Sequence, residues 1–253
     1  MEEQSVAVTV ASQLVMMPQA GIIRDPKLTS IVIPAWLATS ELCDLTWRCM
    51  QAIEKHTPQS HEVILVENGV REGLEEPAED MGYEADVLIR FQENRGYGPA
   101  VNAGFALARG KYLVAMNNDA EVVEDWLSAM HGCWAAHPKV GAISAHITER
   151  DPQRTHLCND ATNQRRAMCG ALWMTTQDVL ADVGGLDEGY AYGMFEDRDF
   201  WERLYRHGYR LFKAGWCRHT INSTWKLLPN QQEIYLRNRK RFEEKWGSWP
   251  NIP

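Results

Sequence analysis

The sequence predicts an α/β protein with a mainly parallel sheet flanked by helices. Short, uninterrupted apolar runs recur through the first half of the chain, and segments with helical spacing separate them. Strands that are apolar on both faces belong to sheets covered on both sides, and parallel strands need crossover connections between them. The 253 residues, 45% of them hydrophobic, are sufficient for one large core.

The first core strand is predicted at residues 31–33, where a β-branched run is closed by Pro34. Upstream, apolar residues alternate over residues 6–10 as in a strand, and residues 21–26 have the composition of a turn. We interpret residues 1–29 as an N-terminal extension of the sheet domain.

A helix is predicted at residues 42–53, because apolar side chains recur there at helical spacing behind a potential N-cap, Ser40. The elements that follow alternate in the same way, with strands at 63–66, 87–89 and 112–116 and helices at 74–82 and 99–109. Pro99 suits the first turn of the last of these helices, and Gly110 suits its C-terminal cap.

The alternation loosens after residue 120. The predicted elements are helices at 124–137, 196–207 and 231–245 and strands at 140–144, 169–175 and 209–213, with a polar stretch at 145–166. Because no linker-like segment interrupts the chain, residues 30–253 are predicted to form a single domain.

The charge of the chain is unevenly distributed. A net charge of -8 and a mean hydropathy of -0.40 argue against a uniformly basic polyanion binder and against an integral membrane protein. Residues 201–253, however, hold 11 Lys and Arg against 4 Asp and Glu. This basic C-terminal region is interpreted as a solvated helix face or as a surface for an anionic partner.

The six cysteines form no C-x-x-C pair and no ladder of short spacings. Neither a zinc ribbon nor a small disulfide scaffold is therefore predicted. We expect free thiols that are buried or have no specific role. The N-terminus lacks the pattern of a signal peptide, and no segment has the length and apolarity of a membrane span. A reducing, cytoplasmic compartment is the resulting expectation.

Candidate functional residues follow the strands, since ligands of such sheets bind beyond the carboxyl ends of the strands. Asn117, Asn118 and Asp119 directly follow an apolar strand and offer oxygen ligands of the kind that hard divalent cations prefer. The same three residues also suit a polar turn that caps the next helix.

A second cluster places three acids, Glu196, Asp197 and Asp199, at the start of a predicted helix. Acids at this position stabilise the helix through its dipole, which explains at least one of them without function. The Gly- and aromatic-rich residues 189–194 precede the cluster, and such a loop can place a carboxylate against a substrate hydroxyl as a general base.

Two further features are less specific. Residues 95–102 run from a loop into a helix, a geometry that suits a phosphate or a nucleoside, yet they match neither the Rossmann glycine pattern nor a Walker loop. His219 follows a predicted strand, where a single histidine is more often structural than a metal ligand.

Taken in order, these segments resemble the family 2 glycosyltransferases with the GT-A fold, in particular the rhamnosyltransferase-like branch. The resemblance extends from about residue 30 to 247. Its motifs are residues 31–34, residues 63–69 (similar to VDNGS), residues 93–104 (similar to N-x-G-x-x-x-x-x-N-x-G), Asn117–Asp119 at the DxD position, residues 184–188 (similar to GGFDE), residues 195–197 at the ED motif, and His219.

The resemblance implies a nucleotide-diphosphate sugar donor, UDP- or dTDP-linked, and an inverting transfer to a hydroxyl. Residues 30–120 would bind the donor and residues 121–253 the acceptor. By similarity, the donor-binding residues are Pro34, Ala35, Glu67, Asn68, Arg95, Gly96, Asn102, Asn117 and Asn118. Asp119 and His219 would hold Mn or Mg, and Asp197 would be the general base, with Glu196 beside it in the catalytic pair.

Two positions depart from the family pattern. Asn117 stands where the first Asp of DxD is usual, which removes one carboxylate from the metal site. Glu67 replaces the usual Asp at the position that contacts the base, which leaves the identity of the nucleotide open.

For the acceptor, the resemblance implies a surface-glycan intermediate or another glycan, including a lipid-linked one, for an enzyme that is cytoplasmic or peripheral at the membrane. Arg237, Arg239, Lys240 and Arg241, with Arg165 and Arg166, suggest a different acceptor, a nucleic acid that bears a modified base. An α/β sheet is also compatible with an NAD-binding oxidoreductase, against which the broken glycine pattern counts, and with a non-catalytic sugar-binding relative.

Overall fold

The computed structural model describes residues 6–9, 25–70, 84–148, 158–220 and 224–248. Its strands are β1 (Val6–Thr9), β2 (Asp25–Leu37), β3 (His61–Val70), β4 (Val87–Phe91), β5 (Gly110–Met116), β6 (Ala120–Val122), β7 (Val140–Ile147), β8 (Cys158–Asp160), β9 (Leu172–Thr176) and β10 (Arg210–His219). Its helices are α1 (Ser40–His56), α2 (Tyr97–Leu107), α3 (Trp126–Ala136), α4 (Gln177–Val183), α5 (Glu196–Arg206) and α6 (Gln231–Trp246).

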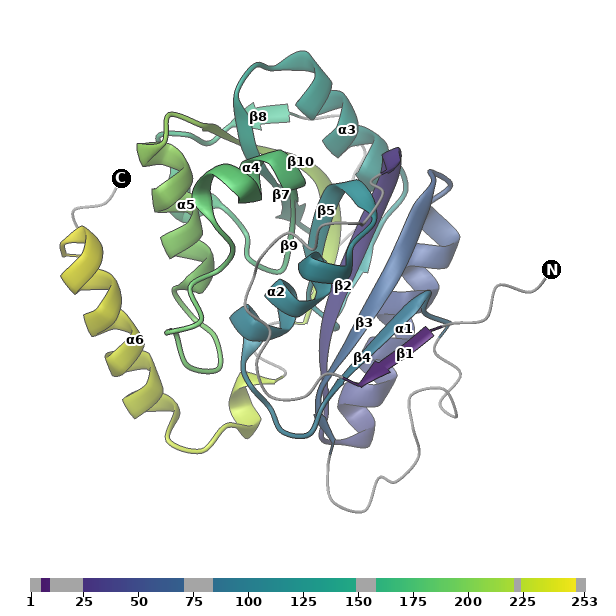
Figure 1. The fold of residues 1–253 in the computed structure, drawn as a ribbon, viewed down its shortest axis with the longest axis vertical. Coiled ribbons are helices and arrows are strands. Elements are labelled where there is room, and N and C mark those ends of the chain that lie inside the picture. The colour runs from purple at the N-terminus through teal and green to yellow at the C-terminus, as the bar shows by residue number, and fades with distance from the viewer. Residues whose placement is uncertain (1–5, 10–24, 71–83, 149–157, 221–223, 249–253) are drawn as a thin grey trace.

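The strands form one mixed sheet with the order β1-β4-β3-β2-β5-β9-β7-β10-β6, and β8 pairs with β10 (Figure 1). The pairs from β1 to β5 are parallel, as is β7 with β10. β9 runs antiparallel to both of its neighbours, β5 and β7. The mainly parallel α/β fold predicted from the apolar runs is therefore confirmed, with one antiparallel strand in its centre.

The sheet divides the core into two layers because alternate side chains of a strand point to opposite faces. In β2, Ile31 and Ile33 pack with residues of α1 and α3, whereas Val32 packs with residues of α2 and α5 on the other side. Both faces are thus covered, which explains why the strands are apolar without interruption.

The sequence predictions differ from the structure at several element boundaries. β1 pairs with β4 and β2 begins at Asp25, so residues 6–9 and 25–29, assigned to an extension, belong to the central sheet. β10 continues to His219, beyond the strand predicted at 209–213, and α4 was not predicted. The helix predicted at 74–82 lies outside the described residues.

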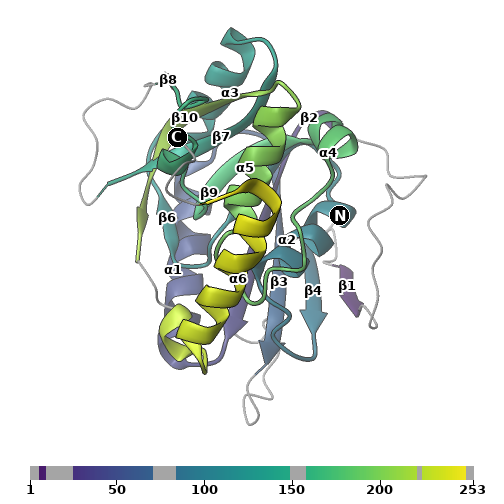
Figure 2. The ribbon, with the colours of Figure 1, turned by 90° about the vertical axis from the view of Figure 1, so that its left-hand side faces the viewer.

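The last helix, α6, lies along the outer side of α5 (Figure 1, Figure 2). Trp246 of α6 donates a hydrogen bond to Asp199 at 2.9 Å, and its ring stacks under the Arg206 guanidinium. Phe242 of α6 packs with Tyr190 and Phe195, which precede α5. α6 therefore holds the segment that leads into α5.

One prediction about the cysteines is wrong. Cys133 of α3 and Cys158 of β8 form a disulfide, although they are 25 residues apart and belong to no short-spacing motif. None of the helices that the structure describes combines the length and the apolarity needed to cross a membrane.

Candidate functional site

A cavity of about 270 Å³ opens at the carboxyl ends of β2, β3, β5 and β10. This volume lies near the ~300 Å³ lower end for small-molecule sites. Its lining comes from segments far apart in the sequence: Pro34, Trp36, Asn68, Asn94, Tyr97, Asn117, Asn118, Asp119, Gly170, Ala171, residues 192–198, His219, Thr224, Trp225 and Leu228. The edge of the sheet predicted to carry the chemistry is the edge that carries the cavity.

The Asn117–Asp119 turn is fixed on both sides by hydrogen bonds. The Asn117 amide donates to the Ala171 carbonyl at 2.7 Å, and the Asn118 side chain donates to Thr46 of α1 at 2.8 Å. Asn118 and Asp119 are 4% and 6% exposed, so their polar groups sit in a low-dielectric wall of the cavity. The turn follows β5 with no intervening residue, as the sequence predicts.

His219, the last residue of β10, lies against this turn. Its Nε2 is 3.1 Å from Oδ1 of Asp119 and 3.4 Å from the side-chain amide nitrogen of Asn117. The strand register places His219 opposite Ala120 of β6, and the Thr220 amide donates to the Asp119 carbonyl. Two residues from distant parts of the sequence are thereby held in contact by the β6–β10 pairing.

The arrangement of Asp119 and His219 fits a divalent cation. It brings one carboxylate oxygen and one imidazole nitrogen together at the cavity wall, and both atoms are ligands of first-row divalent metals.

The three acids at the start of α5 have separate environments. Glu196 and Asp197 line the cavity, and Oε2 of Glu196 is buried without a hydrogen-bond partner among the described residues. Asp199 is fully buried away from the cavity, where Tyr190, Trp246 and Arg203 donate hydrogen bonds to it. Asp199 is therefore a structural acid, and the other two are available for chemistry.

Burial changes the acidity of this pair. Burial raises the pKa of the Glu196 carboxyl, and the negative charge of Asp197 raises it further, to about 8. Burial also raises the pKa of Asp197, with the Arg198 charge acting in the opposite direction. A carboxylate with a raised pKa is a stronger base once ionised, and such shifts are typical of acid–base sites.

The loop before α5 has an unusual backbone. Tyr192, Met194 and Phe195 all have positive φ angles, of 57°, 70° and 77°. Each such residue costs about 1 kcal/mol or more, so neighbouring contacts must hold the loop in place. On one side the Tyr97 amide donates to the Tyr192 carbonyl, and a Cβ at Gly96 would lie 2.9 Å from the Tyr192 backbone.

On the other side, Asn238 of α6 fixes the same loop. Its amide nitrogen donates to the carbonyls of Ala191 and Gly193 at 2.9 and 2.7 Å and lies 3.4 Å from that of Met194. Its Oδ1 accepts from the Ala191 amide at 3.1 Å. Asn238 is 0% exposed and was not singled out by the sequence, because its partners are backbone groups in a distant segment.

Among the residues predicted to bind the donor, Pro34 and Asn68 line the cavity. Asn68 also ties the loop after β4 to the end of β3: its amide donates to the Gly96 carbonyl at 3.0 Å, and its Oδ1 accepts from the Arg95 amide at 2.9 Å. Gly96 therefore does not line the cavity itself, but its carbonyl accepts a hydrogen bond from Asn68, which does.

Besides Gly96, four residues assigned to donor binding do not line the cavity. Ala35 is buried in the core, and Arg95 lies over the Phe91 ring. Glu67 is buried and forms an ion pair with Arg90 on the neighbouring strand.

The fourth, Asn102, is buried in α2, where its side chain exchanges hydrogen bonds with the Leu186 backbone and donates to Glu188. Its side-chain amide is thus engaged by the segment that follows α4, and a role of Asn102 in donor binding stays a prediction.

Several lining residues have no individual role assigned from the sequence, among them Tyr97, which lies within the segment 95–102. Tyr97 donates to the Gly170 carbonyl and accepts from Trp173, so it joins α2 to the strand opposite. Trp36 and Trp225 supply aromatic surface to the cavity. Trp173 and Trp201, in contrast, are core residues.

The basic C-terminal region is largely paired within the chain. On α6, Arg239 pairs with Glu243 and Lys240 with Glu244. Arg241 and Lys245 both contact Asp187.

Arg165, outside α6, is buried against Glu202. The prediction of a nucleic-acid surface therefore receives no support from these contacts, which correspond to a paired helix face.

Two solved structures share this fold. The structure of GalNAc-T7 with UDP, GalNAc and Mn²⁺ aligns with 87% of this chain and 48% of its own length, with a TM-score of 0.69 and 17% identity. The mannosyltransferase PcManGT from Pyrobaculum calidifontis, in complex with GDP-Man and Mn²⁺, aligns with 85% of this chain and 61% of its own length, with a TM-score of 0.62 and 20% identity. The chain has the GT-A glycosyltransferase fold.

Curated relatives match the chain over a shorter region. The undecaprenyl-phosphate 4-deoxy-4-formamido-L-arabinose transferase of Aeromonas hydrophila is 33% identical over 100 residues, which is 38% of this chain and 30% of that protein. The dolichol-phosphate mannosyltransferase of Saccharomyces cerevisiae is 30% identical over 95 residues, which is 36% of this chain and 35% of that protein. The chain thus spans about a third of the length of these relatives.

The family profile "Glycosyl transferase family 2" matches residues 30–178, more than half of the chain. This region begins within β2 and extends to the start of α4, so it includes the Asn117–Asp119 turn and the cavity-lining residues Pro34 and Asn68. The match sets aside an NAD-binding oxidoreductase. The chain belongs to glycosyl transferase family 2.

Proposed function

We propose that this chain is an inverting glycosyltransferase that moves a sugar from a nucleotide-diphosphate donor to a hydroxyl acceptor, with Asp197 as general base. The observation that carries the proposal is one cavity lined by both a cation-binding pair, Asp119 and His219, and a buried acid pair, Glu196 and Asp197. The two pairs match the two requirements of the reaction, which are a site for the diphosphate and a base for the hydroxyl.

In the proposed reaction, Asp197 accepts the proton of the acceptor hydroxyl while the hydroxyl oxygen attacks the anomeric carbon and the bond to the diphosphate breaks. A single displacement inverts the configuration at that carbon. Glu196, with its pKa of about 8, holds a proton at neutral pH and offers a hydrogen-bond donor in the same wall. A divalent cation bound by Asp119 and His219 would neutralise the negative charge of the diphosphate.

The donor contacts proposed for this chain are Pro34, Asn68, Asn117 and Asn118, which line the cavity. The two solved relatives were crystallised with UDP and with GDP-Man, so the sugar nucleotides to be tested include UDP-, GDP- and dTDP-linked sugars. We propose Mn²⁺ as the preferred cation because both solved relatives contain it.

For the acceptor, we propose a hydroxyl on a glycan or on a lipid-linked carrier. The support is the names of two relatives, which refer to undecaprenyl-phosphate and dolichol-phosphate. An enzyme with such an acceptor works at the membrane surface, and a peripheral location is part of the proposal.

The test uses the full chain with a panel of nucleotide sugars, with Mn²⁺, with Mg²⁺ or with a chelator. We expect one class of donor to raise the melting temperature in the presence of Mn²⁺ and to be hydrolysed slowly to the free sugar, and we expect the chelator to abolish both effects. The anomer released first, measured by NMR, is expected to be opposite to that of the donor. Release of the same anomer would overturn the inverting mechanism, and a donor effect that is indifferent to the chelator would overturn the cation site.

A further inference from the structure

A cluster of metal-ligating side chains lies outside the candidate active site. Cys133 and His137 are four residues apart at the end of α3, and Cys158 lies on the neighbouring strand β8. The ligand atoms of the three side chains are all within 4.8 Å of one another. None of the residues of α3 or β8 described by the structure lines the active-site cavity, so this cluster is separate from it.

The backbone holds the three residues together independently of the bond between the sulfur atoms. Cys158 is paired in register with Ala214 of β10, and Cys133 is buried in the core cluster to which Ala214 also belongs. The Cα atoms of the two cysteines are 5.6 Å apart. The two sulfur atoms therefore stay close in either oxidation state of the pair.

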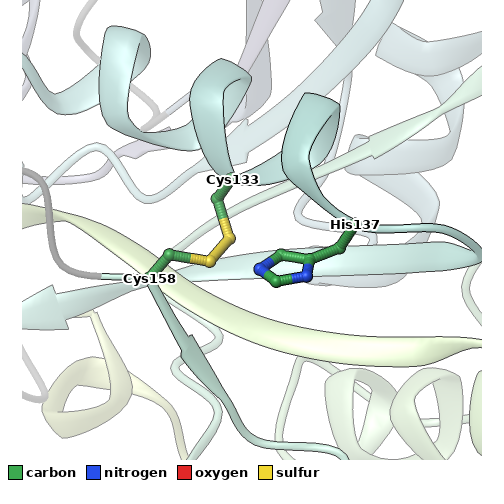
Figure 3. A group of neighbouring side chains, drawn as sticks. All are labelled: Cys133, His137 and Cys158. Carbon is green, nitrogen blue, oxygen red and sulfur yellow. A yellow bond between two sulfur atoms is a disulfide. The ribbon is translucent and has the colours of Figure 1, made fainter.

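His137 points into the same space. Figure 3 shows its imidazole ring beside the two sulfur atoms, with an edge of the ring turned toward them. The ring stacks on Phe212, with 4.4 Å between the centroids and 14° between the planes, which fixes its orientation. Neither ring nitrogen forms a hydrogen bond to another residue within the described ranges, so one nitrogen can carry a lone pair toward the sulfurs.

Two thiolates and an imidazole are the ligands of zinc rather than of the cations expected at Asp119. Zinc takes Cys sulfur and His nitrogen in tetrahedral sites, whereas thiolates are not favoured ligands of Mg²⁺ or Mn²⁺. Three protein ligands leave a fourth position for water. Cys133 lies in the last turn of α3, His137 directly follows that helix, and the third ligand comes from the adjacent strand.

We propose that Cys133, His137 and Cys158 bind one Zn²⁺ when the Cys133–Cys158 disulfide is reduced. The disulfide and the metal exclude each other, because the metal needs both sulfurs as thiolates. Either form links β8 to α3, so the cluster exchanges a covalent link for a coordinated one.

The conversion balances with a phosphine as the reductant. The S–S bond breaks, the phosphine takes the oxygen of one water molecule to become a phosphine oxide, and the two hydrogens of that water give the two thiols. Binding of Zn²⁺ then displaces the two thiol protons to solvent.

The experiment measures zinc retained by the full chain without an affinity tag. An Asp119→Ala background removes the carboxylate of the active-site pair, so zinc retained there is not counted. We expect the phosphine-reduced protein to retain about one zinc ion per chain after desalting, and the oxidised protein to retain almost none. Substitution of Co²⁺ gives a second readout, since a thiolate–cobalt bond produces an absorption band in the near ultraviolet.

Variants separate this site from adventitious binding. Cys133→Ser and Cys158→Ser are expected to abolish zinc retention and the cobalt band, and His137→Ala is expected to weaken affinity by at least about tenfold. Cys43→Ser, which removes a half-buried cysteine on α1, is the matched control and is expected to retain zinc fully.

The proposal is overturned if the reduced protein retains no zinc, or if Cys133→Ser and Cys43→Ser behave alike. His137 is half-buried and outside the disulfide, so its variant keeps the test decisive if the buried Cys133 variant does not fold.

Discussion

At the scale of single residues, chemically similar side chains in this site differ by their surroundings. Asp197 and Asp199 are two positions apart on α5, yet Asp199 is surrounded by donors from Tyr190, Arg203 and Trp246, while Asp197 faces the cavity. The assignment of the base to Asp197 rests on this difference. Glu196 shares the cavity with it, and the two acids influence each other's charge.

Asp197→Asn tests the base directly. We expect kcat to fall by about 10² to 10⁴, the usual contribution of a general base, while the dissociation constant of the donor stays within about twofold. Asp178→Asn, at an exposed acid on α4, is the control and is expected to keep full activity. Turnover assays measure kcat, and donor titrations on the same preparation measure the dissociation constant. A normal kcat in Asp197→Asn would show that another residue is the base.

The raised pKa of Glu196 predicts how the KM for the donor depends on pH. Its pKa is about 8, so the carboxyl is neutral below that pH and negative above it. A second negative charge in the wall disfavours a diphosphate, and we therefore expect the KM for the donor to rise as the pH increases above about 8. Glu196→Gln cannot ionise and should flatten this alkaline rise, which a series of KM measurements on both sides of that pKa will show. If KM for the donor still rises above that pH in Glu196→Gln, a group other than Glu196 causes the rise.

The cation pair gives a third prediction. Asp119→Asn and His219→Gln are each expected to weaken donor binding in Mn²⁺ by at least about tenfold, because each removes one ligand of the proposed ion. In the presence of a chelator the variants and the wild type should bind the donor equally weakly. Glu124→Gln, at an exposed acid nearby, is the matched control, and isothermal titration provides the measurement.

At the scale of elements, α6 determines the shape of the loop that carries the acid pair. The loop has three residues with positive φ before α5, and the amide of Asn238 meets three of its carbonyls. The helix does not line the cavity at Asn238; it acts through the loop. Asn238 is therefore a positioning residue rather than a catalytic one.

Asn238→Ala tests this role. Buried loop carbonyls lose their donor, so we expect a loss of about 1–3 kcal/mol in the free energy of unfolding. We also expect kcat to fall by about tenfold or more at a temperature where the variant is fully folded, because the acid pair is no longer held in place.

Asn238→Asp keeps the acceptor for the Ala191 amide but not the donors, and should also be impaired. Arg239→Ala, on the exposed side of α6, is the control, and circular dichroism reports the folded fraction. Loss of stability with normal kcat would make Asn238 merely structural.

At the scale of the whole molecule, much of the sheet was predictable and much of the site was not. The apolar runs at 31–33, 63–66, 87–89 and 112–116 lie in β2 to β5, because strands buried on both faces are apolar at consecutive residues. Pairing between distant segments leaves no such trace. The Cys133–Cys158 bond and the Arg241–Asp187 ion pair both join segments that only the fold brings together.

The same limit applies to contacts made by residues within the motifs. Asn102 occupies a motif position, yet its amide is engaged by Leu186, which no local pattern indicates. The basic residues of α6 suggest an anionic partner until their acidic neighbours are located. The polar residues that follow the strands did indicate the place of the site. Parallel strands end at the same edge of a sheet, so these residues gather there whatever their other contacts are.

The link between α6 and the body of the molecule predicts how stability depends on acid. Burial alone would raise the pKa of Asp187, but hydrogen bonds from Lys245, the Gly189 amide and Arg241 lower it, to about 2. Asp187 therefore stabilises the fold above its unfolded pKa of 3.8, and this contribution is lost as the pH falls toward 2. Because solvent screens these partly exposed charges, we expect Asp187→Asn to be less stable than the wild type by only about 1 kcal/mol at a pH of about 6, and the difference to vanish near pH 2. Denaturant titrations at both pH values, with Asp178→Asn as the control, check this.

The position of α6 in the chain has a consequence for biosynthesis. On the ribosome, β2 to β10 and α5 emerge before Asn238, so the sheet can assemble while the loop at 190–195 still lacks its donor. A nascent chain that stops before α6 would hold the cation pair of the β5 and β10 ends without an ordered base. Ordering of the loop that carries the acid pair therefore requires synthesis of residues 231–246 and packing of α6, and not only assembly of the sheet and α5.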